Sequence, residues 1–191
     1  MTRHRQMLPQ LDGPLFLTDG GIETTMIFHK GIDLPEFATF VLLDDENGSA
    51  ALDDYYRGYL DIASATNSGF VLEAATWRAN RDWGAKLGYS RERLADINRR
   101  AINFLEQLRE DYAGNEQPIV ISGNIGPRGD GYVAGEKMTA DEAAEYHRDQ
   151  VEVFADTSAD MVTAMTMTYV EEAIGIVRCA SWRPVLDPVS C

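Results

Sequence analysis

The sequence repeats one order four times: a short apolar run, a polar or glycine-rich turn, and a longer stretch with helical periodicity. The apolar runs are rich in β-branched and large aliphatic residues, which is typical of buried strands. Strands that alternate with helices form parallel sheets through right-handed crossovers. The repeat therefore predicts an α/β fold with four βα units, whose strands cover 15–18, 70–75, 118–122 and 160–164.

The stretches between these runs carry the start and stop signals of helices. Ser49 and Ser90 stand before apolar stripes as N-caps, and Thr139 with Glu142 has the spacing of a capping box. Gly31 is placed to end the first helix. These signals predict helices over 22–30, from Ser49 to before Asn67, from Ser90 to near Gly114, from Thr139 past Phe154, and over 169–179.

The first predicted strand runs directly into Asp19, Gly20 and Gly21. Paired glycines allow a ligand to approach the main-chain N–H groups, and the aspartate places a carboxylate beside them. One acid and two open amides can hold a free amino acid, with its ammonium on the carboxylate and its carboxylate on the amides. A tight turn capped by the aspartate is the alternative interpretation of these residues.

Polar and glycine-rich residues also follow the second and third predicted strands. Thr76 and Trp77 follow the second strand, and a loop over 123–129, which includes Asn124 and Gly126, follows the third. The carboxyl ends of parallel strands lie at one edge of the sheet, where barrel enzymes place their active sites. We therefore expect these residues to share one pocket.

The composition limits the partners of this chain. Its 191 residues include 31 acidic and 17 basic side chains, which gives a formal net charge of −14. This excess of negative charge argues against nucleic acid or an anionic membrane surface as a partner. No segment has the length and apolar character of a membrane span, and Cys179 and Cys191 lack a CxxC spacing, so we expect a cytoplasmic protein.

The chain resembles the homocysteine S-methyltransferase family, which includes the betaine-dependent enzymes, in four segments that occur in the family's order: LTDGGIETT, FVLEAATWRAN, VISGNIGPRGDGY and ADMVTAMTMTYVEEAIGIV. The resemblance implies a (β/α)8 TIM barrel, of which this chain holds about the first four βα units. It also implies homocysteine as the thiol substrate, a methyl donor as the second partner, and methionine as the product. The implied substrate-binding residues are Asp19, Gly20, Gly21, Thr76, Trp77, Asn124 and Gly126.

Two departures from the family pattern limit what the resemblance carries over. Many members end the fourth strand with a Glu-Thr pair whose glutamate binds the substrate ammonium, whereas this chain reads Met-Thr-Met-Thr over 165–168. The family's zinc is held by three cysteine thiolates from later strands, and the two cysteines of this sequence cannot supply that set. Zinc is therefore expected in full-length relatives, and no metal ligand is assigned in this chain.

The resemblance divides the chain into an N-terminal extension over 1–14, a partial homocysteine-binding barrel over 15–177, and a divergent tail over 178–191. Two prolines interrupt the tail where a fifth strand is expected, which indicates a frameshifted or truncated gene product. Two functions follow from this division. The first is an S-methyltransferase that is impaired in this chain, and the second is a non-catalytic half-barrel that dimerises or binds a partner to cover its open sheet edges.

Several side chains have alternative roles that the sequence leaves open. Strand alternation points Glu73 either into the barrel or outward. Trp77 and Trp83 either stack on the cation of a methyl donor or pack near the barrel rim. His29 and His147 have no second ligand at i+4, so we expect solvated or locally bonded histidines.

Overall fold

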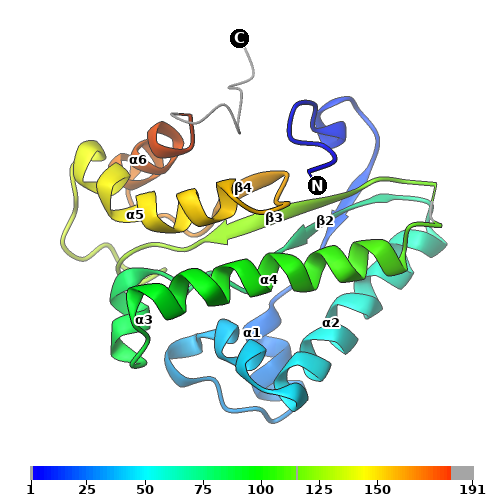
Figure 1. Cartoon of the computed structure of the whole chain (residues 1–191), viewed down its shortest axis with the longest axis horizontal. Coiled ribbons are helices and arrows are strands. Elements are labelled where there is room, and N and C mark those ends of the chain that lie inside the picture. The colour runs from blue at the N-terminus through cyan, green and yellow to red at the C-terminus, as the bar shows by residue number, and fades with distance from the viewer. Residues whose placement is uncertain (1, 115, 182–191) are drawn as a thin grey trace.

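The computed structural model describes residues 2–114 and 116–181 and contains a four-stranded parallel sheet (Figure 1). The strands lie in the order β1 (Phe16–Thr18), β2 (Gly69–Glu73), β3 (Ile119–Ile125) and β4 (Met161–Ala164). Each strand pairs in parallel with the next strand along the chain, as consecutive βα units do in a TIM barrel. The α/β class and the parallel order of the four predicted strands are confirmed, and the fold is a partial TIM barrel.

Helical segments follow every strand. The short segment η1 (Pro9–Leu11) precedes β1, and β1 is followed by α1 (Ile22–Thr24), the π-helical turn η2 (Thr25–His29), η3 (Pro35–Phe37), η4 (Thr39–Asp44) and α2 (Glu46–Ala65). The later segments are α3 (Arg81–Lys86) and α4 (Arg91–Asp111) after β2, α5 (Ala140–Ala155) after β3 and α6 (Val170–Ser181) after β4. Helices α4, α5 and α6 lie side by side in chain order (Figure 1). Within 2–114 and 116–181, no helix has both the length and the apolar character needed to cross a membrane.

The N-termini of α4 and α5 confirm the predicted capping. The Ser90 hydroxyl accepts a hydrogen bond from the Arg93 amide at 3.2 Å. Thr139 and Glu142 form the reciprocal capping box, in which each side chain bonds to the other residue's backbone N–H. Local side-chain chemistry alone therefore determines where these two helices begin.

Two helix starts differ from the prediction. The predicted start of α2 at Ser49 is wrong, because the Asp45 carboxylate accepts the Gly48 N–H at 2.8 Å and begins the helix at Glu46. The sequence pattern also predicts no helix at α3, which Asn80 caps by accepting the Trp83 N–H at 3.3 Å. In both cases a side-chain acceptor at the N-cap outweighs the apolar stripe as a start signal.

One face of the sheet packs against the helices. Phe70, Leu72 and Ile121 are at most 1% exposed and share one buried cluster with residues of α2 and α4, Leu60 and Ile102 among them. Burial of a side chain of this size contributes roughly 1.5–3 kcal/mol, so this cluster is a main source of the stability of the fold. Because side chains alternate along a strand, the residues next to these three on β2 and β3 face the barrel interior.

The predicted tail over 178–191 overlaps the end of α6, which continues to Ser181. The rest of the predicted tail, 182–191, lies outside the described residues. The predicted N-terminal extension over 1–14 includes residues that bond to the far end of the sheet from the strand tips.

Asp160, directly before β4, connects three segments at that far end of the sheet. Its carboxylate is 0% exposed and accepts hydrogen bonds from Arg109 Nη1 at 2.7 Å and from the Ile121 N–H at 3.0 Å. Its other oxygen accepts the N–H groups of Arg3 and His4, each at 2.9 Å. A single buried carboxylate thus links α4, β3 and the N-terminal residues.

We expect Asp160→Ala to lower the free energy of unfolding by about 3–5 kcal/mol, because Arg109 is then left buried without this partner. Urea denaturation measures the change. Asp141→Ala is the matched control, because Asp141 also pairs with an arginine, Arg178, while its side chain is 92% exposed. The control is expected to change stability by less than about 1 kcal/mol, and equal effects of the two substitutions would contradict the role of Asp160.

Candidate functional site

A cavity of about 550 Å³ opens where the carboxyl ends of the four strands meet. Each strand end contributes to its wall, as expected for a site at the carboxyl edge of a barrel. The lining residues at the strand ends are Asp19, Gly20 and Gly21 after β1, Glu73 and Trp77 at the end of β2, Asn124 in β3, and Met165 and Thr166 after β4.

The Asp19 carboxylate lies in this cavity beside the exposed Gly20 and Gly21. Tyr55 of α2 donates its hydroxyl to Asp19 Oδ2 at 3.0 Å and lies 2.9 Å from the Gly20 carbonyl. Burial raises the pKa of Asp19 to about 7, the Tyr55 hydrogen bond opposes this shift, and the nearby charge of Glu73 adds to it. Near neutral pH this carboxyl group is therefore present in both its protonated and its ionised form.

Glu73 points into the barrel, which resolves the alternative that the sequence left open. It is 5% exposed, and its Oε1 accepts the Thr163 hydroxyl of β4 at 2.8 Å. Thr163 also lies 2.7 Å from the Ser122 hydroxyl of β3. Burial raises the pKa of Glu73, although the hydrogen bond from Thr163 acts in the opposite direction. A chain of side-chain hydrogen bonds thus crosses the inner face from β2 to β4.

Trp77 lines the cavity, and its neighbours hold it in position. The Trp77 indole N–H donates to the Thr166 hydroxyl at 3.0 Å. Thr76 is fully buried and donates to the Asn124 carbonyl at 2.7 Å, while a Cβ at Gly126 would lie 2.2 Å from the Trp77 carbonyl. Thr76 and Gly126, predicted as substrate-binding residues, are not among the cavity-lining residues and instead fix the loop that carries Trp77.

Arg78 occupies the aromatic faces that the sequence left open for a methyl-donor cation. Its guanidinium carbon lies 4.0 Å from the ring centroid of Trp77 and 3.7 Å from that of Trp83. The Lys86 ammonium lies 3.7 Å from the Trp83 centroid as well. These indoles therefore stack on the protein's own cations, which favours the packing alternative for both tryptophans.

The structure thus brings five of the predicted site residues to one cavity, and their role in substrate binding stays a prediction. These are Asp19, Gly20, Gly21, Trp77 and Asn124. Tyr55 and Arg78 were not predicted as site residues from the sequence. A tyrosine hydroxyl on the core face of a helix and an arginine between two tryptophans were the available signals, because both polar groups need a partner when buried.

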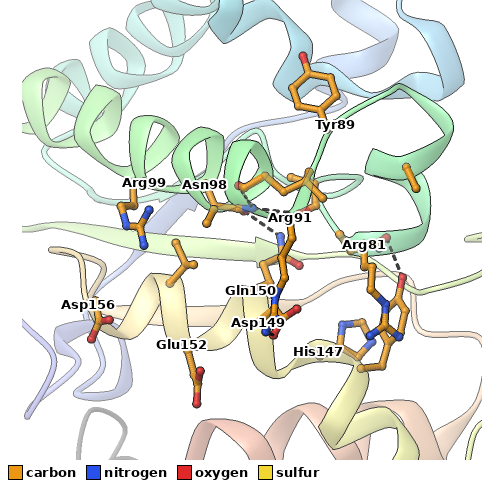
Figure 2. A pocket seen from close by; sticks show the side chains of 17 residues that line it. Arg81, Tyr89, Arg91, Asn98, Arg99, His147, Asp149, Gln150, Glu152 and Asp156 are labelled. Atoms are coloured by element: carbon orange, nitrogen blue, oxygen red, sulfur yellow. Dashed lines mark hydrogen bonds and ion pairs between the residues drawn. The ribbon is translucent and has the colours of Figure 1, made fainter.

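A second cavity, of about 360 Å³, lies between α4 and α5 (Figure 2). Two of its lining residues, Asn98 and Gln150, bond to backbone carbonyls of the loop that carries Trp77. Gln150 donates to the Thr76 carbonyl at 3.1 Å and to Asn98 Oδ1 at 3.0 Å, and Asn98 donates to the Ala79 carbonyl at 3.0 Å. His147, also in this region, is buried and lies 2.9 Å from Glu172, which agrees with the prediction of a locally bonded histidine.

The described residues do not fit a zinc site. They contain no group of three or more His, Cys, Asp or Glu side chains placed to hold a metal ion. Cys179 is buried in α6, where burial raises the pKa of its thiol and disfavours the thiolate that zinc binds. Cys191 lies outside the described residues. Since a catalytic zinc needs three protein ligands, no metal-dependent step is assigned to this part of the chain.

A partial TIM barrel with a cavity at the carboxyl edge of its strands has the fold, and the site position, that are typical of barrel enzymes. The sequence model of the family named homocysteine S-methyltransferase matches residues 16–189. The protein therefore belongs to the homocysteine S-methyltransferase family. The match continues past Val177, where the resemblance was expected to end.

Two solved structures of the homocysteine methyltransferase MmuM from Escherichia coli share the fold. The oxidised form has a TM-score of 0.74 at 16% identity, with 92% of this chain and 61% of that chain covered. The metallated form has a TM-score of 0.72 at 20% identity, with 94% and 63% covered. This chain therefore spans less than two thirds of the length of either structure. A comparison with curated proteins found no match.

We expect the Asp19 carboxyl group to titrate near pH 7 in carbon-13 NMR, and Tyr55→Phe to raise its pKa further, because the substitution removes a hydrogen bond to the ionised form. Tyr59→Phe is the control. Tyr59 stacks edge-on against Tyr55 with ring centroids 5.1 Å apart, and this substitution removes a similar hydroxyl group from the same helix. An Asp19 pKa near 4 in the wild type, or an identical shift in both variants, would contradict this electrostatic account.

Proposed function

We propose that this protein holds homocysteine by its amino-acid end and takes part in methyl transfer to the homocysteine thiol, which gives methionine. The observation that supports this most directly is the Asp19 carboxylate beside the exposed Gly20 and Gly21, at the strand-end cavity of a member of this family. This arrangement offers both a negative group and open backbone amides to one small ligand.

In this proposal the homocysteine ammonium donates charge-assisted hydrogen bonds to Asp19. The homocysteine carboxylate accepts hydrogen bonds from the N–H groups of Gly20 and Gly21, which are exposed and line the cavity. A ligand held by both charged groups of its amino-acid end presents its side chain into the cavity, near Trp77 and Met165. Orientation of this kind is what a transfer between two bound molecules requires.

The second substrate, a methyl donor, has room at the mouth of the cavity. Phe28, Phe37 and Tyr132 line this mouth and are 76%, 56% and 87% exposed. Methyl transfer breaks the bond between the methyl group and the rest of the donor and forms a carbon–sulfur bond at the homocysteine thiol, whose proton is released to solvent. Because the described residues do not fit a zinc site, the role proposed for them is to bind and orient the substrate.

We expect homocysteine to bind this chain in isothermal titration calorimetry at pH 8, and Asp19→Asn to weaken the binding by at least about ten-fold, as loss of a charged hydrogen-bond partner does. In the wild type the affinity should fall as the pH decreases below about 7, because Asp19 is then protonated and its negative charge is lost. The Asp19→Asn variant should show a flatter pH profile over the same range.

The control for this experiment is Asp54→Asn, because Asp54 pairs with Lys30 on the exposed surface and does not line the cavity. It should leave the homocysteine affinity unchanged. Unaltered binding by Asp19→Asn would remove Asp19 from the proposed role. No binding of homocysteine by the wild type at millimolar concentration would overturn the proposed function itself.

A second candidate function is a non-catalytic half-barrel that pairs with a second copy of the chain. The observation that favours it is an apolar stripe on α6, where Val170, Ile174 and Val177 are 66%, 41% and 65% exposed. The preceding strand, β4, pairs only with β3 among the described strands. An apolar stripe beside an open sheet edge is the kind of surface that another chain covers.

This second function predicts a dimer in size-exclusion chromatography with light scattering, and a monomer for Ile174→Lys, because a charge in a buried apolar contact disfavours association. Val133→Lys is the control, since Val133 is 68% exposed but lies in the loop after β3. A monomeric wild type at high protein concentration would exclude this function and leave the first proposal unaffected.

A further inference from the structure

We propose that Glu73 is a second carboxylate of the same substrate site and that it receives, together with Asp19, the ammonium group of the amino acid. This inference rests on the proposed function and adds a specificity-determining residue to it. Glu73 then selects ligands that carry a primary ammonium group next to the thiol side chain.

The position of Glu73 supports this role. It is the last residue of β2 and pairs in register with Ser122 of β3. The pleat directs its side chain to the interior face, where it lines the cavity together with Asp19. The two carboxylates are close enough that the charge of Glu73 raises the pKa of Asp19. One small cation between them would therefore interact with both.

Glu73 also has an unused hydrogen-bond acceptor. Its Oε1 accepts the Thr163 hydroxyl, whereas its Oε2 is buried and has no hydrogen-bond partner. Asn124 Oδ1, in the same cavity, is likewise buried and unpartnered. A buried acceptor without a donor costs free energy, and more so when it is charged. Two such atoms in one cavity indicate that a donor group from a ligand belongs there.

The cavity supplies no cation of its own to Glu73. Arg78 is the cationic side chain among the described residues that line the cavity, and its Nη1 donates to the Gly129 carbonyl at 3.0 Å. The acidic groups that act most on Arg78 are Asp130 and Glu23, not Glu73. Arg78 thus belongs to a different part of the wall, and the inner part around Glu73 has no cationic side chain among the described residues.

A primary ammonium group fits this inner wall better than other donors do. It carries a positive charge, which matches two neighbouring carboxyl groups, and three N–H donors, which match Asp19, Glu73 Oε2 and Asn124 Oδ1. A hydroxyl group offers one donor and no charge. A metal ion is disfavoured, because the described residues contain no cluster of three ligating side chains.

The test compares two ligands by isothermal titration calorimetry at pH 8. Homocysteine carries the ammonium group, and 4-mercaptobutanoate retains its thiol and carboxylate but has hydrogen in place of the ammonium. We expect Glu73→Gln, which keeps the size of the side chain and removes its charge, to weaken homocysteine binding at least ten-fold. The same substitution should leave binding of 4-mercaptobutanoate unchanged or make it stronger, so that the selectivity between the two ligands decreases.

The matched control is Glu110→Gln. Glu110 pairs with Arg3, its side chain is 49% exposed, and it does not line the cavity. It should change both affinities by less than two-fold. Equal weakening of both ligands by Glu73→Gln would show that Glu73 only supports the shape of the pocket, and it would overturn the inference. Unchanged homocysteine binding would also overturn it while leaving the proposed function intact.

Failure of the proposed function gives a different result. If the wild type binds no homocysteine, the same measurement is made with 3-aminopropane-1-thiol, which has the ammonium and the thiol but no carboxylate. Binding of this amine that is lost in Glu73→Gln supports the ammonium site even though the proposed substrate is wrong. No binding of either amine overturns both proposals.

Discussion

The alternation of side chains along four parallel strands determines which residues reach the cavity. Phe70 and Leu72 of β2 point toward the helices and are buried there, so Glu73, the next residue, must point into the barrel. The same alternation places Ser122 and Asn124 on the inner face of β3, while Gly123 between them faces α5. There the Phe154 ring lies 2.5 Å from where a Cβ of Gly123 would be, so no side chain fits. A shift of one residue in any strand would exchange the polar inner face with the apolar outer face.

This constraint explains which parts of the fold could be predicted from the sequence. The strand order, the capping of α4 and the capping box of α5 depend on residues close together in the chain and were predicted, whereas α3 was not. The register between strands depends on contacts between distant segments. The sequence therefore identified Glu73 as a strand residue but could not determine its direction, because every residue of β2 is buried on one face or the other.

The candidate site shows the same division between local and distant causes. The Asp19-Gly20-Gly21 turn has a local signal, whereas the functions of Thr76 and Gly126 depend on a contact between two loops. Thr76 bonds to β3, and Gly126 leaves room for the Trp77 backbone. A residue at the tip of a strand can thus serve the site either by touching a ligand or by placing a neighbour, and these roles differ only in three dimensions.

The same cavity reduces the stability of the fold at neutral pH. Because the pKa of Asp19 is raised to about 7 in the folded protein, the folded state binds more protons than the unfolded state between about pH 4 and 7. The contribution of this group to stability is most favourable below the unfolded pKa and is lost as the pH rises toward 7.

Thr166, at the cavity wall, adds backbone strain with a φ of 56°, a conformation that is unfavourable for a β-branched residue. Groups that are costly in the absence of a ligand are expected where a ligand with complementary charge binds, because binding then recovers part of that cost. In this chain the residues proposed to hold the substrate are present, whereas no metal-ligand set is found among the described residues.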